Sequence, residues 1–152
     1  MNHTPFVKIA LAQLAHARSG DKADWVDFGL FAWNEAGYRI LEREVTAAKV
    51  QAHFAPWLSG HVDAWPLPNI WALKFVLHGA LQGGGARNLR LDNLGKAMGA
   101  ALLRLEIEVT AEELERCPHL AHPPGHPLVL SSSCLIQLQA AHPAQHALQC
   151  LA

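Results

Sequence analysis

The alternation of apolar and polar residues predicts four β-strands in the first 109 residues. In the clearest case, Val26, Phe28 and Leu30 share one side of an extended segment, which is typical of a half-buried strand. Pro66 and Pro68 place another strand at a sheet edge or a strand end, because proline donates no ladder hydrogen bond. The predicted strands are residues 7–11, 25–33, 61–67 and 105–109.

Apolar residues at helical spacing predict helices between these strands. Asn34 and Thr46 are residue types that cap helix N-termini, and each precedes such a pattern. The pattern consists of Tyr38 and Leu41 after Asn34, and of Val50 and Phe54 after Thr46. Asp92 is expected to cap the most regular helix, with apolar residues at Leu94, Ala97, Met98, Ala101, Leu102 and Leu105.

Two segments are harder to assign. Asn69 is a capping type, and a stripe at positions 70, 73, 77 and 81 favours a helix after it, whereas residues 73–77 alone favour a strand. The polar residues 18–24 indicate a turn or loop, and residues 89–91 a short extended piece. Strands interrupted by two or three helices indicate an α+β fold.

Composition narrows the possible functions. The formal net charge is −1, which offers no bulk attraction for nucleic acid or for an anionic membrane. No segment approaches the roughly 20 apolar residues of a membrane span. The N-terminal residues lack the basic start and the apolar core of a signal peptide, so we expect a cytoplasmic location.

The character of the chain changes near residue 110. Residues 117–152 contain no Asp, Glu, Lys or Arg, and they hold five of the ten histidines and five of the nine prolines. We therefore expect a domain over residues 1–112 and an uncharged extension over residues 113–152 that is poorly ordered or was never selected as part of the domain. The three cysteines all lie in this extension, at 117, 134 and 150, and its Cys and His spacings match no zinc module, so we expect no metal site.

A glycine run followed by cations is the strongest candidate for a ligand site. Gly83, Gly84 and Gly85 precede Arg87 and Arg90, and backbone N–H groups beside cations suit an anion. If the polar segment near residue 20 folds against this run, the two form one positively charged pocket. The candidate ligand-binding residues are Arg18, Ser19, Asp21, Lys22, Asn69, Gly83, Gly84, Gly85, Arg87, Arg90 and Lys96. The alternative is structural: a hydrogen-bonded turn, a packing hinge and solvated cations.

Catalytic chemistry has weaker support. Asp21, His78 and Lys96 are the candidate acid–base residues, although a histidine on an apolar segment is more often a hydrogen-bonded core residue. Most of the five tryptophans are expected to fill the core or to cover sheet edges. Trp65 and Trp71, which flank Pro66 and Pro68, are the candidates for lining a groove or a subunit contact.

An ordered series of short motifs resembles the small ferredoxin-fold domain of the acyclic terpene utilisation (AtuA-like) proteins. The series is Arg18-Ser19-Gly20-Asp21-Lys22, Leu67-Pro68-Asn69, residues 75–81, residues 83–92 with Gly95-Lys96, and Leu102-Leu103-Arg104. The resemblance covers roughly residues 6–109. It implies a ferredoxin-like α+β sandwich, mainly antiparallel, with helices packed on one face. Ala23 and Gln82 depart from it, because both stand where glycine is usual.

The resemblance also implies a role in the catabolism of terpenoid or branched-chain acids at the acyl-CoA level, beside a larger AtuA-like protein or domain. We expect an accessory binding domain that forms homo-oligomers, with no cofactor other than a CoA thioester as ligand, and with no nucleic acid or membrane partner. The alternatives are a small hydratase- or isomerase-type enzyme subunit, and a purely structural oligomerisation module.

Overall fold

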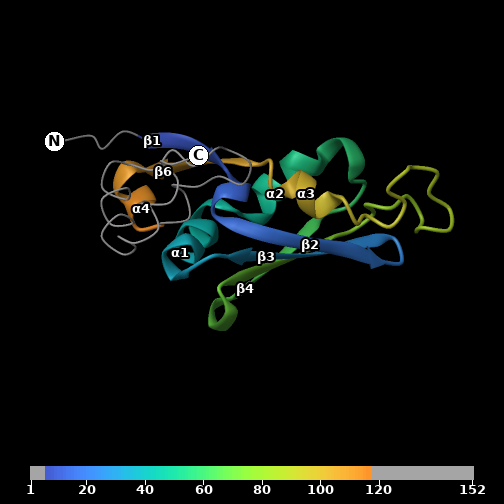
Figure 1. Ribbon diagram of the computed structural model, residues 1–152. Helices are drawn as coiled ribbons and strands as arrows, with labels where there is room; N and C mark the ends of the chain where they lie inside the picture. Colours follow the sequence, from blue (N-terminus) through green and yellow to red (C-terminus); the bar gives the residue numbers. More distant parts are fainter. Residues whose placement is uncertain (1–5, 118–152) are drawn as a thin grey trace, which may run out of the picture.

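The computed structural model describes residues 6–117, which form two antiparallel sheets and four α-helices (Figure 1). The strands are β1 (Phe6–Ala10), β2 (Ala15–Lys22), β3 (Trp25–Ala32), β4 (Val62–Leu67), β5 (Ala72–Leu77) and β6 (Glu106–Thr110). The helices are α1 (Glu35–Glu44), α2 (Ala47–Phe54), α3 (Met98–Leu102) and α4 (Ala111–Glu115), and short 3₁₀ turns span Leu11–Gln13, Ala55–Trp57 and Pro68–Ile70. The expected α+β class is confirmed.

The larger sheet has the strand order β2-β3-β5-β4, with every neighbouring pair antiparallel. The two-stranded sheet pairs β1 with β6, so the two ends of the domain meet although about 100 residues separate them. All four predicted strands are present, and β4, which contains Pro66 and ends just before Pro68, lies at the sheet edge.

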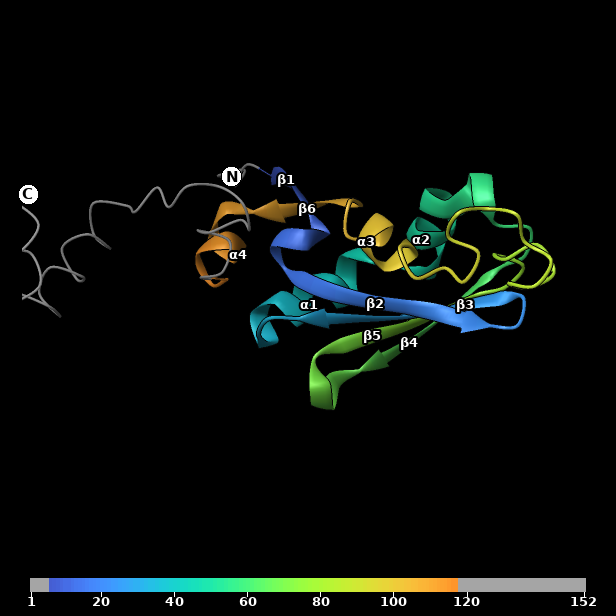
Figure 2. The ribbon, with the colours of Figure 1, turned by 45° about the vertical axis from the view of Figure 1, so that its right-hand side comes forward.

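One face of the larger sheet is covered and forms the core. Helices α1, α2 and α3 lie on the same side of the sheet (Figure 2), and each contacts at least one of its strands. Val26, Phe28 and Leu30 point to this side and are fully buried, and the Phe28 ring lies 5.5 Å from the ring of Phe54. Within residues 6–117, no α-helix covers the opposite face, which we call the outer face.

The predicted helix caps at Asn34 and Thr46 form. The Asn34 side chain accepts a hydrogen bond from the Gly37 amide at 2.7 Å, and the Thr46 hydroxyl accepts one from Lys49 at 3.3 Å. These bonds satisfy amide groups that have no partner within the helix. Helices α1 and α2 therefore begin where the sequence indicated.

Residues 18–22 are a strand, and the prediction of a loop over 18–24 was wrong. They belong to β2, which pairs with β3 without interruption from Ala15 opposite Ala32 to Lys22 opposite Trp25. Only Ala23 and Asp24 form the turn, and Ala23 adopts a φ of 56°. Because β2 is an edge strand with one uncovered face, its outward-pointing Arg18 and Lys22 remain exposed to solvent.

The segment after Asn69 is a strand, so the helix interpretation is wrong and the strand alternative is confirmed. Leu73, Phe75 and Leu77 of β5 point into the core, and Lys74 and Val76 alternate with them. The apolar positions of this segment fit the spacing of a helix as well as the alternation of a strand. The pairing of β5 with both β3 and β4 decides between the two.

The helix after Asp92 is shorter than predicted. The Asp92 carboxylate does accept hydrogen bonds from the amides of Lys96 (2.7 Å) and Ala97 (2.9 Å). However, Gly95 adopts a φ of +63°, which is incompatible with a right-handed helix, so α3 starts only at Met98. Residues 89–91 belong to no helix or strand.

The described fold continues past residue 112. Glu113 of α4 forms an ion pair with Arg43 of α1, and Cys117 is buried in the core cluster. The remainder of the expected extension, from residue 118 onward, lies outside the described residues.

Candidate functional site

A shallow cavity of about 440 Å³ lies on the outer face of the larger sheet. Its floor contains two glycines of neighbouring strands, Gly20 of β2 and Gly29 of β3. A glycine adds no side chain to the sheet surface, so two such positions leave a depression between the surrounding side chains. The surrounding residues are Arg18, Ser19, Asp21, Lys22, Asp27, Phe31, Leu67, Ala72, Leu73, Lys74 and Lys96.

Lys96 reaches the cavity from a distant part of the sequence. Its ammonium lies over Gly20, so close that a Cβ on Gly20 would stand 2.9 Å from Nζ. It also lies 3.5 Å from the Asp21 carboxylate. Gly20 therefore allows a cation from the α3 side of the molecule to extend over the edge strand.

Cations outnumber carboxylates around the cavity. Lys74 forms an ion pair with Asp27, and Lys96 forms one with Asp21. Arg18 and Lys22 have no carboxylate partner within residues 6–117; the Lys22 ammonium donates only to the Asp21 backbone carbonyl. Two unpaired positive charges thus remain beside the cavity, an arrangement that attracts an anion.

Ser19 has a different role from its neighbours. Its hydroxyl donates to the Gly95 carbonyl at 2.6 Å and accepts from the Gly99 amide at 2.7 Å. The Ser19 side chain is therefore directed away from the outer face and fastens β2 to the segment that carries Lys96. Although sequence reasoning grouped Ser19 with the ligand-binding residues, its hydrogen bonds are structural.

The glycine run does meet the β2–β3 turn, but not through its cations. The Gly83 amide donates to the Asp24 carboxylate at 2.6 Å. Gly84 has a φ of +98°, and a Cβ there would stand 3.2 Å from the Ala23 carbonyl oxygen. These glycines allow close backbone packing against the turn, and the anion-binding amide that sequence reasoning expected is here bonded to a carboxylate of the protein itself.

The remaining candidate residues lie elsewhere. Arg90 donates to the Ala80 carbonyl at 2.5 Å and to the Asn88 side chain at 3.3 Å, so its guanidinium braces the loop. Gly85 packs against Leu94, and Arg87 lies beside Gly83. None of these residues lines the cavity, and neither does Asn69, which lies in the 3₁₀ turn between β4 and β5.

The three candidate acid–base residues are divided between two places. Asp21 and Lys96 lie together at the cavity, whereas His78 lies at the end of β5 with its Nε2 atom 2.8 Å from Asp63 Oδ2. His78 does not line the cavity.

Sequence reasoning missed several residues of the cavity, among them Asp27, Gly29 and Lys74. The sequence around each of them indicates its orientation. Each lies between two apolar residues that point into the core, so it must point to the uncovered side of its strand. Their proximity to Arg18 had no such signal, because it follows from the register in which Gly29 faces both Arg18 and Lys74.

The chain was also compared with known proteins. A family model described as the AtuA ferredoxin-like domain matches residues 9–108, which is well over half of the chain. No curated protein and no solved structure matches it significantly. Among residues 6–117, no helix has the length and apolar character needed to cross a lipid bilayer.

Proposed function

Because the chain belongs to the AtuA ferredoxin-like domain family, we propose that it is a binding domain that holds an anionic ligand in the outer-face cavity and acts beside a larger AtuA-like protein. The family relationship suggests the ligand class: a carboxylate or CoA thioester of a terpenoid or branched-chain acid. In this proposal the chemistry of catabolism takes place on the larger partner.

The observation that carries the proposal is the excess of cations around a glycine-floored depression. Among residues 6–117, four cations (Arg18, Lys22, Lys74 and Lys96) and two carboxylates (Asp21 and Asp27) line it. Bringing like charges together on a folded surface is unfavourable, and a bound anion offsets that cost. Arg18 suits a carboxylate or phosphate particularly well, since its planar guanidinium donates two parallel hydrogen bonds.

Apolar side chains beside the cavity support contact with a partner. Trp65, Leu67, Ile70 and Trp71, at the β4–β5 hairpin, are 40–57% exposed, and Leu67 also lines the cavity. Trp71 has a φ of 50°, a left-handed conformation that is rare for a bulky residue and costs about 1 kcal/mol or more. We assign this patch to docking on the AtuA-like partner or on a second copy of the chain.

A second candidate function is a hydratase- or isomerase-type enzyme subunit. It is favoured by one observation: the Asp21 carboxylate and the Lys96 ammonium lie 3.5 Å apart at the cavity, as a general base and its orienting cation would. Turnover of an enoyl or hydroxyacyl thioester by the purified chain, lost in Asp21→Asn, would establish this alternative.

Calorimetric titration with CoA, acyl-CoA thioesters and branched carboxylates tests the binding function. Two exposed arginines offer a matched pair of variants, since Arg18 lines the cavity and Arg87 does not. We expect Arg18→Ala to weaken saturable binding by about 10- to 100-fold, the value of a charge-assisted hydrogen bond. Arg87→Ala should bind as tightly as the unmodified chain.

The outcome can contradict the proposal in two ways. If Arg18→Ala and Arg87→Ala weakened anion binding equally, the loss of net charge would explain the effect and the cavity would have no specific role. Binding of none of these anions, together with formation of oligomers that Trp71→Ser disrupts, would favour the structural oligomerisation module instead.

A further inference from the structure

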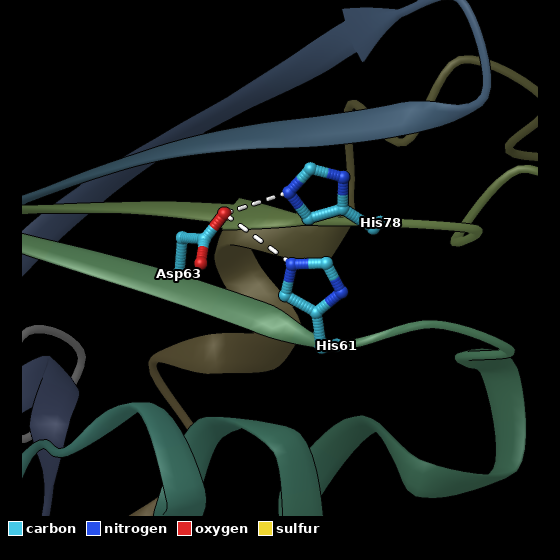
Figure 3. A group of neighbouring side chains, drawn as sticks. All are labelled: His61, Asp63 and His78. Atoms are coloured by element: carbon cyan, nitrogen blue, oxygen red, sulfur yellow. Dashed lines mark hydrogen bonds and ion pairs between the residues drawn. The ribbon is translucent and has the colours of Figure 1, made fainter.

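Three side chains with metal-binding groups converge at one end of the outer face (Figure 3). His61 precedes β4, Asp63 belongs to β4, and His78 follows β5 directly. The Nε2 atom of His78 lies 2.8 Å from Asp63 Oδ2, and the Nε2 atom of His61 lies 3.5 Å from the same oxygen. One donor atom from each residue lies within 4.8 Å of the other two.

The backbone of the β4–β5 pair holds the three residues in this arrangement. The His78 amide donates to the His61 carbonyl at 2.9 Å, which makes the two histidines direct neighbours across the strands. His61 and Asp63 are two residues apart on an extended chain and thus share one face. The imidazole rings of His61 and His78 are stacked with centroids 4.2 Å apart, and Trp25 packs on the His78 ring at 4.5 Å.

We propose that His61, Asp63 and His78 form a binding site for a divalent transition-metal ion, with Zn²⁺ the best match. Two imidazole nitrogens and one carboxylate oxygen are typical zinc ligands, whereas Mg²⁺ and Ca²⁺ prefer all-oxygen sites. Ligand atoms around a tetrahedral zinc ion lie about 3.3 Å apart. The two N–O distances, 2.8 and 3.5 Å, lie on either side of that value, so small side-chain rotations complete the site.

An ordinary histidine–aspartate hydrogen bond does not account for the whole arrangement. Such a bond needs one imidazole, and His78 supplies it. The His61 side chain is 66% exposed, and its Nε2 atom faces the same carboxylate oxygen at 3.5 Å, which is too long for a good hydrogen bond. Stacking on His78 keeps the His61 ring at this place, and a cation bound between the three donor atoms would link both rings directly to that oxygen.

The site is distinct from the anion cavity. None of His61, Asp63 and His78 lines that cavity, although both sites lie on the outer face. With three protein ligands, a tetrahedral ion keeps its fourth position open to water or to an oxygen of a small ligand. The metal site and the anion cavity can therefore be tested separately.

The test is a Zn²⁺ titration of the full chain labelled with ¹⁵N-histidine, followed by NMR of the imidazole nitrogens, with calorimetry in parallel. Five further histidines lie at positions 119–146 and are themselves potential ligands, so a readout that resolves individual histidines is needed. We expect the signals of His61 and His78 to shift together at one equivalent of zinc, and not with excess Mg²⁺.

Two variants and one control sharpen the test. His61→Ala removes an exposed ligand and Asp63→Asn keeps the side-chain shape, so both variants should fold, which circular dichroism verifies. Each should weaken zinc binding at this site by about tenfold or more. His16→Ala removes an exposed imidazole on β2 that lies outside the cluster, and it should leave the affinity unchanged.

The proposal is overturned if zinc shifts only the signals of histidines beyond residue 118. It is likewise overturned if His16→Ala weakens binding as much as His61→Ala. Neither result would bear on the separate proposal that an anion binds beside Arg18.

Discussion

The Ser19→Ala substitution tests how the fold positions Lys96 over the cavity. Ser19 is 8% exposed, and its hydroxyl bridges the Gly95 carbonyl and the Gly99 amide at 2.6 and 2.7 Å. Alanine fits the space but leaves both backbone groups without that partner in a buried position. Each unsatisfied group costs about 1–3 kcal/mol, so we expect a loss of about 2–4 kcal/mol in the free energy of unfolding.

Chemical and thermal unfolding followed by circular dichroism measure this loss. For a domain of this size, 1 kcal/mol corresponds to about 4 °C, so the midpoint should fall by about 8–16 °C. Ser59→Ala is the matched control, because the Ser59 hydroxyl donates to the Gly79 carbonyl at 3.0 Å in an exposed position. It should cost no more than about 0.5 kcal/mol, as surface substitutions usually do.

A difference of less than about 0.5 kcal/mol between the two variants would refute the structural role given to Ser19. Unchanged stability combined with lost anion binding would restore Ser19 to the ligand-binding residues.

Three further predictions concern stability. Hydrogen bonding from Arg43 lowers the pKa of the Glu113 carboxyl from 4.5 to about 2, so the pair stabilises the fold above about pH 4.5 and the contribution disappears as the pH falls through 2. Equilibrium unfolding at pH 7 should show Glu113→Gln destabilised by about 1 kcal/mol at most, and this difference should shrink as the pH falls from 4.5 and vanish below pH 2; a constant difference would contradict the assignment. Ala23→Gly should raise the free energy of unfolding by about 1 kcal/mol, since φ is 56° there, and a lowered melting temperature would argue against a strained turn. Gly79→Ala should cost about 2 kcal/mol, because φ is +67° and the new Cβ would clash with the Ser59 hydroxyl; a neutral effect on urea unfolding would show that the turn adapts.

Local patterns predicted much of the fold. The caps at Asn34 and Thr46 and the alternating strand at residues 25–33 were correct, because side-chain capping and period-two burial act over a few residues. The resemblance also located two unusual backbone positions. Ala23 and Gln82 are the two positions at which the resemblance suggested glycine, and they adopt φ values of 56° and 53°.

Predictions that depended on long-range pairing were less successful. Residues 18–22 looked like a loop because nothing local shows that β3 supplies their hydrogen bonds. The apolar residues of 73–77 fit a helix as well as a strand, and only the two flanking strands decide between them.

The candidate sites show the same division between local and long-range information. The sequence alone suggested Arg18, Lys22 and Lys96 among the cations of a candidate anion site, since charge and residue type are properties of single positions. Only the tertiary structure placed these three around one cavity with Lys74 and away from Arg87, and only the β4–β5 register placed His61 and Asp63 beside His78. Proximity between residues far apart in the chain is a product of sheet register, and register is set by the burial of the whole sheet face.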